Sequence, residues 1–394
     1  MFNNFTYYTP TKVIFGNDAE KNLGDLIKDN NCNKVLVVYG GKSVLKNGVL
    51  KKVTDALLAK NVNFVELNGV VPNPKLSKVY EGIELAKKEN VDFILAVGGG
   101  SVIDTAKAIA FGIANDDDVW DIIMGKAQPK KCAPVATVLT IAAAGSEMSM
   151  SLVITKDETN EKRGLDNDLC RPRFSIMNPT FTKTLPDYQT QSGCTDILMH
   201  TMERYFTNGE HLELTDNIAE ALMRTVIKNA VILHEDPFND QGRAEIMWAG
   251  SLSHNGLTGC GIKSGDFTCH MLEHELGGMY DVTHGAGLAA VWGTWAKYVY
   301  KDALPRFVRF ARNVMNVSDT NISDEEFALK GIVALEDFFR RIGMPTNLRE
   351  LGINPTEEEF VSLAKNCALA TGGEWGSAKK LYEKDMYNIY KLAK

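Results

Sequence analysis

The sequence has no cysteine cluster, no long apolar run and no opening stretch typical of a secretory leader, and each absence argues against a class of protein. Its seven cysteines are scattered and never spaced C-x-x-C, so neither a disulfide framework nor a thiolate zinc site is expected. No segment approaches the roughly 18 uninterrupted apolar residues of a membrane-spanning helix. The first residues, MFNNFTYYTPTKVIFG, lack a basic start followed by an apolar run. We therefore expect a cytoplasmic protein without a membrane partner.

Positive charge is also scarce. The formal net charge is -7 and no dense lysine or arginine run occurs, which argues against nucleic acid as a partner. Hydrophobic residues make up 44% and charged residues 24%, as in an ordinary soluble globular protein. Because 394 residues exceed the usual size of one hydrophobic core, two domains are expected.

The first half of the chain alternates short β-branched runs with amphipathic stretches. The runs at residues 11–16, 34–40, 63–69, 92–99 and 134–140 predict strands. Between them, residues 46–60 and 76–90 carry apolar side chains at three- and four-residue intervals, which is typical of helices. Such alternation predicts a parallel sheet covered on both faces.

The pattern changes after residues 174–179 and Pro186. From there on the chain shows almost only amphipathic helical stretches, for example residues 214–235 and 323–343. The expected fold class is α/β plus all-α, with a parallel-sheet domain over residues 1–185 and an all-helical domain over residues 186–394. A cleft between two such domains is the usual place for a ligand.

A glycine-rich turn follows the strand predicted at residues 92–99. It consists of Gly98, Gly99, Gly100 and Ser101, before a helix expected to open at about Val102. Backbone N–H groups at a helix N-terminus favour a phosphate, but the dinucleotide fingerprint G-x-G-x-x-G is not spelled here. A plain tight turn therefore remains an alternative. Asp104 and Lys107 could likewise be ordinary capping or solvated residues of this helix.

A second turn, at Gly40, Gly41, Lys42 and Ser43, ends the strand predicted at residues 34–40. Dinucleotide enzymes that bind NAD typically hold the ribose 2'-hydroxyl with an acidic side chain, and this turn has none. If it receives the ribose, Lys42 and Ser43 could bind a 2'-phosphate, so NADP(H) would be preferred over NAD(H). Lys42 could equally be a solvated surface lysine.

Three of only seven histidines fall within fifteen residues, at His270, His274 and His284. The first two are spaced i, i+4 and share one face of a helix. Taken alone, HMLEH at residues 270–274 matches the pattern H-x-x-E-H of zinc peptidases. A peptidase, however, would leave both glycine-rich turns and a whole parallel sheet without a role.

Asp196 and His200 form a second i, i+4 pair, on a segment whose other side chains are largely apolar. A buried aspartate is costly unless it is paired or coordinated, although a helix-start aspartate near Ser192 is the alternative. Together the pairs offer one carboxylate and up to four imidazoles, which suits Fe(II) or Zn(II).

The joint pattern resembles the iron-containing alcohol dehydrogenase family, in particular its NADPH-linked butanol dehydrogenase branch. The resemblance rests on YGGKSVLKNG, VVPNP, GGGSVIDTAK, TVLTIAAAGSEMS, SGCTDILMH and HMLEHELGGMYDVTHGAGLA, in that order between residues 39 and 289. It implies a Rossmann-like domain joined to an all-helical domain, with metal and cofactor in the cleft between them. Three positions depart from common family patterns: Gly41, where NAD-preferring members carry an aspartate, and Ala144 and Leu288.

The resemblance also implies roles for individual residues. The metal ligands would be Asp196, His200, His270 and His284, while His274 would lie beside the nicotinamide and substrate. The glycine-rich turn would hold the pyrophosphate, with Asp104 near the nicotinamide end. The remaining cofactor groove would be lined by Asn73, Thr137, Thr140 and Lys162.

The implied activity is reversible hydride transfer between NADP(H) and a small primary alcohol or its aldehyde. His274 is the nearest candidate for a proton relay, because imidazole titrates near neutrality. The alternative is a lyase resembling dehydroquinate synthase, which uses a metal and NAD on the same fold. The resemblance further implies a homodimer or a larger homo-oligomer.

Overall fold

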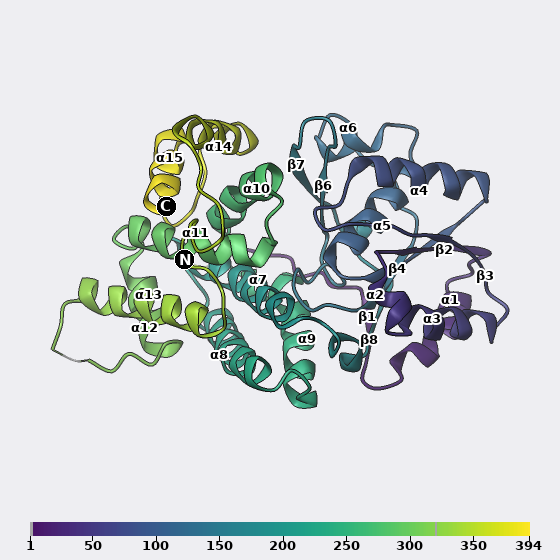
Figure 1. Ribbon diagram of the computed structural model, residues 1–394, viewed down its shortest axis with the longest axis horizontal. Helices are drawn as coiled ribbons and strands as arrows, with labels where there is room; N and C mark the ends of the chain where they lie inside the picture. Colours follow the sequence, from purple (N-terminus) through teal and green to yellow (C-terminus); the bar gives the residue numbers. More distant parts are fainter. Residues whose placement is uncertain (1–2, 320) are drawn as a thin grey trace. The chain divides into compact units, whose positions relative to one another are not determined.

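The computed structural model describes residues 3–319 and 321–394, which form two compact units (Figure 1). One unit comprises residues 9–185, and the other combines residues 3–8 with residues 186–394. Among the described residues, none of the helices is both long and apolar enough to cross a membrane.

Residues 9–185 are organised around a parallel sheet of six strands in the order β1-β8-β5-β4-β2-β3. The strands are β1 (Lys12–Phe15), β2 (Lys34–Tyr39), β3 (Asn63–Leu67), β4 (Phe93–Gly98), β5 (Val135–Leu139) and β8 (Phe174–Met177). The central strands β4 and β5 are buried along their whole length, as expected for a sheet covered on both faces. The predicted Rossmann-like sheet is confirmed.

Helices cover both faces of this sheet (Figure 1). Helices α1 (Leu23–Asp29) and α3 (Val49–Leu58) pack on alternate residues of the strands, such as Val35 and Val37. Helices α4 (Leu76–Lys88) and α5 (Gly100–Ala114) pack together, and α5 contacts β4. Because side chains alternate along a strand, this arrangement leaves no polar face on the central strands.

A two-stranded antiparallel hairpin, which the sequence did not predict, follows β5. It pairs β6 (Ser151–Thr155) with β7 (Lys162–Asp166), and β6 contacts α5. The same unit contains two short helices, α2 (Ser43–Lys46) and α6 (Val119–Ile123).

Residues 186–394 contain helices and no named strand among those described, as the sequence predicts. The helices are α7 (Asp187–Tyr205), α8 (Glu213–Glu235), α9 (Asp240–His254), α10 (Thr268–Tyr280), α11 (His284–Val299), α12 (Leu304–Asn313), α13 (Asp324–Arg341), α14 (Glu357–Ala370) and α15 (Glu383–Leu392). Helix α7 packs against α8, α9 and α11. Every residue of α7 from Thr190 to Glu203 is buried, although many are polar.

The segment before the sheet belongs to the helical unit. Residues 3–8 group with residues 186–394, and the Asn3 amide donates a hydrogen bond to the Gly261 carbonyl at 3.0 Å. The prediction that residues 1–185 form one domain is thus wrong for this segment, because nothing local in residues 3–8 identifies a partner so far along the chain.

Candidate metal and nucleotide sites

Helix α7 supplies two polar side chains to the interior of the helical unit. Asp196 and His200 are both buried, with 3% and 5% of their surface exposed. Both lie in the middle of a helix that begins at Asp187, so the alternative of a helix-start aspartate is wrong. One helical turn separates them, and the His200 Nδ1 lies 3.5 Å from the Asp196 Oδ1.

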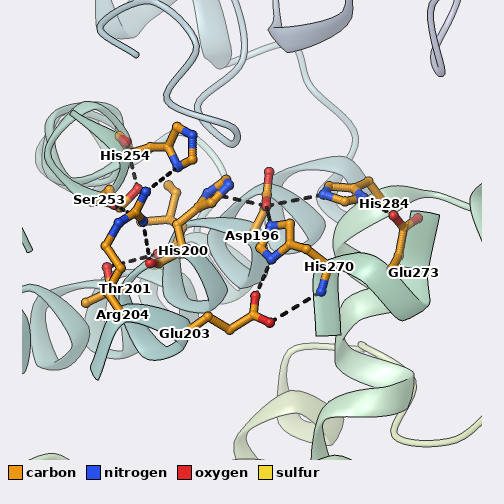
Figure 2. Close-up of polar contacts among 12 residues, drawn as sticks. Asp196, His200, Thr201, Glu203, Arg204, Ser253, His254, His270, Glu273 and His284 are labelled. Atoms are coloured by element: carbon orange, nitrogen blue, oxygen red, sulfur yellow. Dashed lines mark hydrogen bonds and ion pairs between the residues drawn. The ribbon is translucent and has the colours of Figure 1, made fainter. Parts of the chain in front are cut away.

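Helices α10 and α11 bring two further imidazoles to the same carboxylate (Figure 2). His270, in the first turn of α10, places its Nε2 3.6 Å from the Asp196 Oδ1. His284, the first residue of α11, places its Nε2 at the same distance of 3.6 Å from that oxygen. Three imidazole nitrogens from three helices thus converge on one carboxylate oxygen.

The converging atoms are suited to hold a cation. The Asp196 Oδ1, the His200 Nδ1 and the His270 Nε2 are buried and have no hydrogen-bond partner. Leaving several buried polar atoms unpaired is costly, and a metal ion would satisfy all of them. Asp196, His270 and His284 also have ligand atoms within 4.8 Å of one another. The donor set of one carboxylate and neutral imidazoles fits Fe(II) or Zn(II).

Two glutamates orient the imidazoles of His270 and His284 through the ring nitrogen that faces away from Asp196. The Glu203 carboxylate is hydrogen-bonded to the His270 Nδ1, and the Glu273 carboxylate to the His284 Nδ1. Carboxylates in this position fix the ring and leave Nε2 to face a metal. Glu203 was not predicted from the sequence, because an acid near the end of a helix usually faces solvent and its partner lies 67 residues further along the chain.

Charges around the cluster set the protonation of the imidazoles. Burial disfavours the imidazolium form of His270, but Glu203 and Asp196 outweigh it and raise the pKa to about 9. Burial and the neighbouring His254 and His270 rings hold the pKa of His200 well below its usual value. The carboxylates around the cluster therefore favour positive charge at this position.

A close helix contact fixes the position of His284. At Gly285, an added Cβ would overlap the backbone carbonyl of Ser192 on α7. Glycine at this position therefore allows α11 to approach α7 closely enough for His284 to reach Asp196.

His274 lies one turn beyond His270 on α10 and is partly exposed. Its ring centroid is 6.4 Å from that of His270 and 5.9 Å from that of His284. It can also group with Glu273 and His284 as ligand atoms within 4.8 Å. His274 is thus next to the cluster and reaches the surface, while the four residues predicted as ligands converge without it.

The two glycine-rich turns lie in the sheet unit, at the same edge of the sheet. The parallel pairings Tyr39↔Val97 and Gly98↔Leu139 place the ends of β2, β4 and β5 side by side. Ligands of open α/β sheets bind at this carboxyl edge. The turn at residues 40–43, the turn at residues 98–101 and Thr140 all follow directly on these strand ends.

The turn after β4 allows a close approach of backbone. Helix α5 begins at Gly100, with Gly99 as its N-cap, two residues earlier than predicted. An added Cβ at Gly99 would overlap Ile141, and one at Gly100 would lie 3.1 Å from the Ala144 side chain. The first N–H groups of α5 have no acceptor within the helix, so this turn can receive an anionic group.

The other predicted nucleotide residues have different surroundings. Gly41, Lys42 and Ser43 are exposed, and an added Cβ at Gly41 would meet nothing within 4 Å. Asn73 has a positive φ of 51° in the loop after β3. Thr137 and Lys162 are buried, on β5 and β7 respectively.

Asp104 and Lys107 connect α5 to residues 146–149 and to strand β6 of the hairpin. The Asp104 carboxylate accepts hydrogen bonds from the Ser146 hydroxyl at 2.7 Å and the Val153 N–H at 3.1 Å. The Lys107 ammonium is fully buried and donates to the Ser146, Ser149 and Ser151 carbonyls at 2.8, 3.0 and 2.8 Å. The alternative of a solvated helix residue is therefore wrong for Lys107.

Removal from water affects both of these ionised groups. Burial raises the pKa of Asp104 to about 6, even though Lys107 and the hydrogen bond from Ser146 favour the carboxylate. Burial also lowers the pKa of Lys107, although the surrounding acidic groups favour its charged form.

Comparison with known proteins identifies both units. Residues 10–179 match the family model described as iron-containing alcohol dehydrogenase, and residues 190–394 match the C-terminal model of the Fe-containing alcohol dehydrogenase family. The chain is 42% identical over 388 residues to NADH-dependent butanol dehydrogenase A of Clostridium acetobutylicum, with 98% of each chain covered. It is 35% identical over 355 residues to the NADPH-dependent aldehyde reductase YqhD of Escherichia coli, covering 89% of this chain and 90% of the relative.

A solved structure agrees with these matches. The crystal structure of NADH-dependent butanol dehydrogenase A from Thermotoga maritima superimposes with a TM-score of 0.95 at 40% identity. The match covers 100% of this chain and 99% of that chain.

Proposed function

Because the chain belongs to the iron-containing alcohol dehydrogenase family, we propose that it interconverts a small primary alcohol, such as butanol, and its aldehyde. The reaction is hydride transfer with a nicotinamide nucleotide. The observation that carries the proposal is the set of buried, unpartnered atoms of Asp196, His200 and His270, joined by His284.

In this proposal the four residues hold one Fe(II) or Zn(II) ion. Such an ion supplies Lewis-acid polarisation of the substrate oxygen, and the nucleotide supplies the hydride. The protein contributes orientation, because Glu203 and Glu273 fix two of the imidazoles. His270→Ala should remove metal binding and turnover while leaving nucleotide affinity unchanged, since the nucleotide residues belong to the sheet unit. Metal retention in that variant would contradict the assignment.

His274 holds or releases the proton that the alcohol oxygen gains or loses. Its place beside the candidate ligands and its partial exposure support a link to solvent. His274→Ala should therefore retain the metal and lose rate. Loss of the metal in this variant would instead make His274 a ligand.

For the nucleotide, we propose that NADP(H) is preferred over NAD(H). The turn after β2 offers Lys42 and Ser43 and no acid, and the space beside Gly41 is open. The names of the relatives point both ways, since the butanol dehydrogenases are called NADH-dependent and YqhD is called NADPH-dependent. A direct comparison of kcat/KM with NADPH and NADH decides the question.

Gly41→Asp tests the physical reason for this preference. A carboxylate at this position would repel a 2'-phosphate and accept a hydrogen bond from a free ribose hydroxyl. The variant should shift the ratio of the two kcat/KM values toward NADH by more than about tenfold, corresponding to about 1.4 kcal/mol. Lys42→Met should shift it in the same direction. An unchanged ratio in both variants would show that this turn does not receive the ribose.

An assay of aldehyde reduction with net consumption of the nucleotide tests the whole proposal. The rate is measured before chelation, after chelation and after adding back Fe(II) or Zn(II). A lyase would consume no nucleotide, and the family match does not favour that alternative. The expected homodimer or larger homo-oligomer is tested separately by light scattering.

A further inference from the structure

His200 differs from the other two imidazoles of the candidate metal cluster. The Nδ1 atoms of His270 and His284 are held by Glu203 and Glu273, and their Nε2 atoms face Asp196. His200 instead turns its Nδ1 toward Asp196. Among the described residues, no carboxylate other than that of Asp196 pairs with its ring, and its Nδ1 has no hydrogen-bond partner.

Ring packing takes the place of that carboxylate. The His200 ring lies between the rings of His254 and His270, with centroid distances of 4.1 Å and 4.6 Å (Figure 2). His254 is the last residue of α9, so its contact with His200 links α9 to the middle of α7. An imidazole without a fixed hydrogen bond can rotate about its last side-chain bond, and neighbours on two sides restrict that rotation.

Arg204 fixes the ring of His254. One of its guanidinium nitrogens lies 3.1 Å from the His254 Nδ1. Because a guanidinium can only donate, the His254 Nδ1 accepts this hydrogen bond. The same interaction sets the orientation of the ring.

Arg204 is itself held in place. Its second terminal nitrogen donates to the His200 carbonyl at 2.6 Å and the Ser253 carbonyl at 3.0 Å. Its guanidinium also lies over the Phe267 ring, 4.9 Å from the centroid. Arg204 therefore links the backbone of His200 to the backbone of Ser253, the residue next to His254.

We propose that Arg204 and His254 are positioning residues for the candidate metal centre, which hold the His200 imidazole toward Asp196 in place of a carboxylate partner. The proposal rests on the metal-dependent function proposed above. It assigns the His254 ring a role in shaping the site, and Arg204 a role in fixing that ring.

The test compares His254→Ala, which removes the ring, with His254→Phe, which retains a flat ring. Zn(II) affinity is measured by titration of the metal-free protein, and the visible spectrum is recorded for the Co(II)-loaded protein. Loss of a residue that orients a metal ligand typically weakens affinity about 10- to 100-fold. His254→Ala should show a loss of Zn(II) affinity of this size and shifted Co(II) bands. In His254→Phe the increase in log Kd for Zn(II) should be at most half of that in His254→Ala.

His234→Ala is the matched control, because His234 also pairs with a residue of α7, Asp187, at 2.8 Å. It should bind Zn(II) as the wild type does. Wild-type affinity and an unchanged Co(II) spectrum in His254→Ala would overturn the proposal, as would equal losses in His254→Ala and His254→Phe. Should His254→Ala not fold, the Co(II) spectrum of His254→Phe carries the test: bands close to those of the wild type support positioning by the ring, and bands of a different geometry overturn it.

The design separates this proposal from the proposed function. A wild-type protein that binds no Zn(II) or Co(II) would refute the metal-dependent function. A wild-type protein that binds both ions, together with a His254→Ala variant that binds them equally well, would refute only the positioning role.

Discussion

The buried ammonium of Lys107 allows the strength of one internal network to be measured. Its Nζ donates to three backbone carbonyls, and also to the hydroxyls of Ser146 and Ser149 at 2.9 and 3.4 Å. The Ser146 hydroxyl in turn donates to Asp104. Lys107→Met keeps an unbranched side chain that is one atom shorter, but removes every one of these hydrogen bonds.

The expected loss follows from what the substitution leaves behind. Each buried carbonyl that loses its donor costs about 1–3 kcal/mol, unless its neighbours rearrange. Removing one partner of a buried charge network costs about 3–5 kcal/mol in measured cases. We take about 3–5 kcal/mol as the expected loss in the free energy of unfolding, because relaxation of the 146–151 segment offsets part of the sum. At about 2–4 °C per kcal/mol, the melting temperature of the sheet unit should fall by roughly 6–20 °C.

Urea and thermal unfolding, followed by circular dichroism, measure this loss. Lys51→Met is the control, because Lys51 is exposed and pairs with Asp55 at 2.7 Å on the surface of α3. It should change stability by no more than about 0.5 kcal/mol. The double variant Asp104→Asn with Lys107→Met should be more stable than the sum of the single losses, since it no longer holds the Asp104 carboxylate without the nearby Lys107 charge. A loss in Lys107→Met below about 1 kcal/mol would refute the reasoning.

Three further substitutions test other parts of the molecule. Burial raises the pKa of Asp104 to about 6, so the folded state binds its proton more tightly than the unfolded state, whose value is about 3.9. The stabilisation from this proton is complete below about pH 3.9 and is lost as the pH rises through about 6. In urea unfolding, the stability of Asp104→Asn should not fall over this pH range as that of the wild type does. An equal pH dependence of stability in both proteins would contradict the prediction. Gly285→Ala should push α11 away from Ser192 and weaken Zn(II) binding, and wild-type affinity would show that the helices can adjust. Thr356→Ala removes the capping box with Glu359 at the start of α14 and should cost about 1 kcal/mol in urea unfolding, whereas a loss below about 0.3 kcal/mol would show that Thr356 contributes little.

The sequence predicted those parts of the fold whose signal is local. Apolar runs such as residues 92–99 predicted strands because a buried parallel strand has no polar face. Alternating strands and helices predicted the parallel sheet, and the absence of strand-like runs after Pro186 predicted the helical unit. The hairpin of β6 and β7 was missed because one of its strands, KRGLD, carries two basic residues and an acid and therefore lacks an apolar run.

The candidate metal cluster was predictable only in part. The spacing of His270 and His284, and of Asp196 and His200, pointed to a site because such residues are rare and unusually close in the sequence. The groups that orient them could not be found in this way. Glu203 and Arg204 look like ordinary charges near the end of a helix, and the His254 partner of Arg204 lies 50 residues away. Only the tertiary packing of α7, α9 and α10 brings these groups together.

The membership of residues 3–8 in the helical unit has a consequence for synthesis of the chain. The Gly261 carbonyl that accepts from Asn3 is made 258 residues later, which at about 5–20 residues per second corresponds to a delay of roughly 13–50 s. During that interval residues 9–185, which form the sheet unit, are all made. The hydrogen bond that ties Asn3 to the helical unit can therefore form only after every residue of the sheet unit has been made.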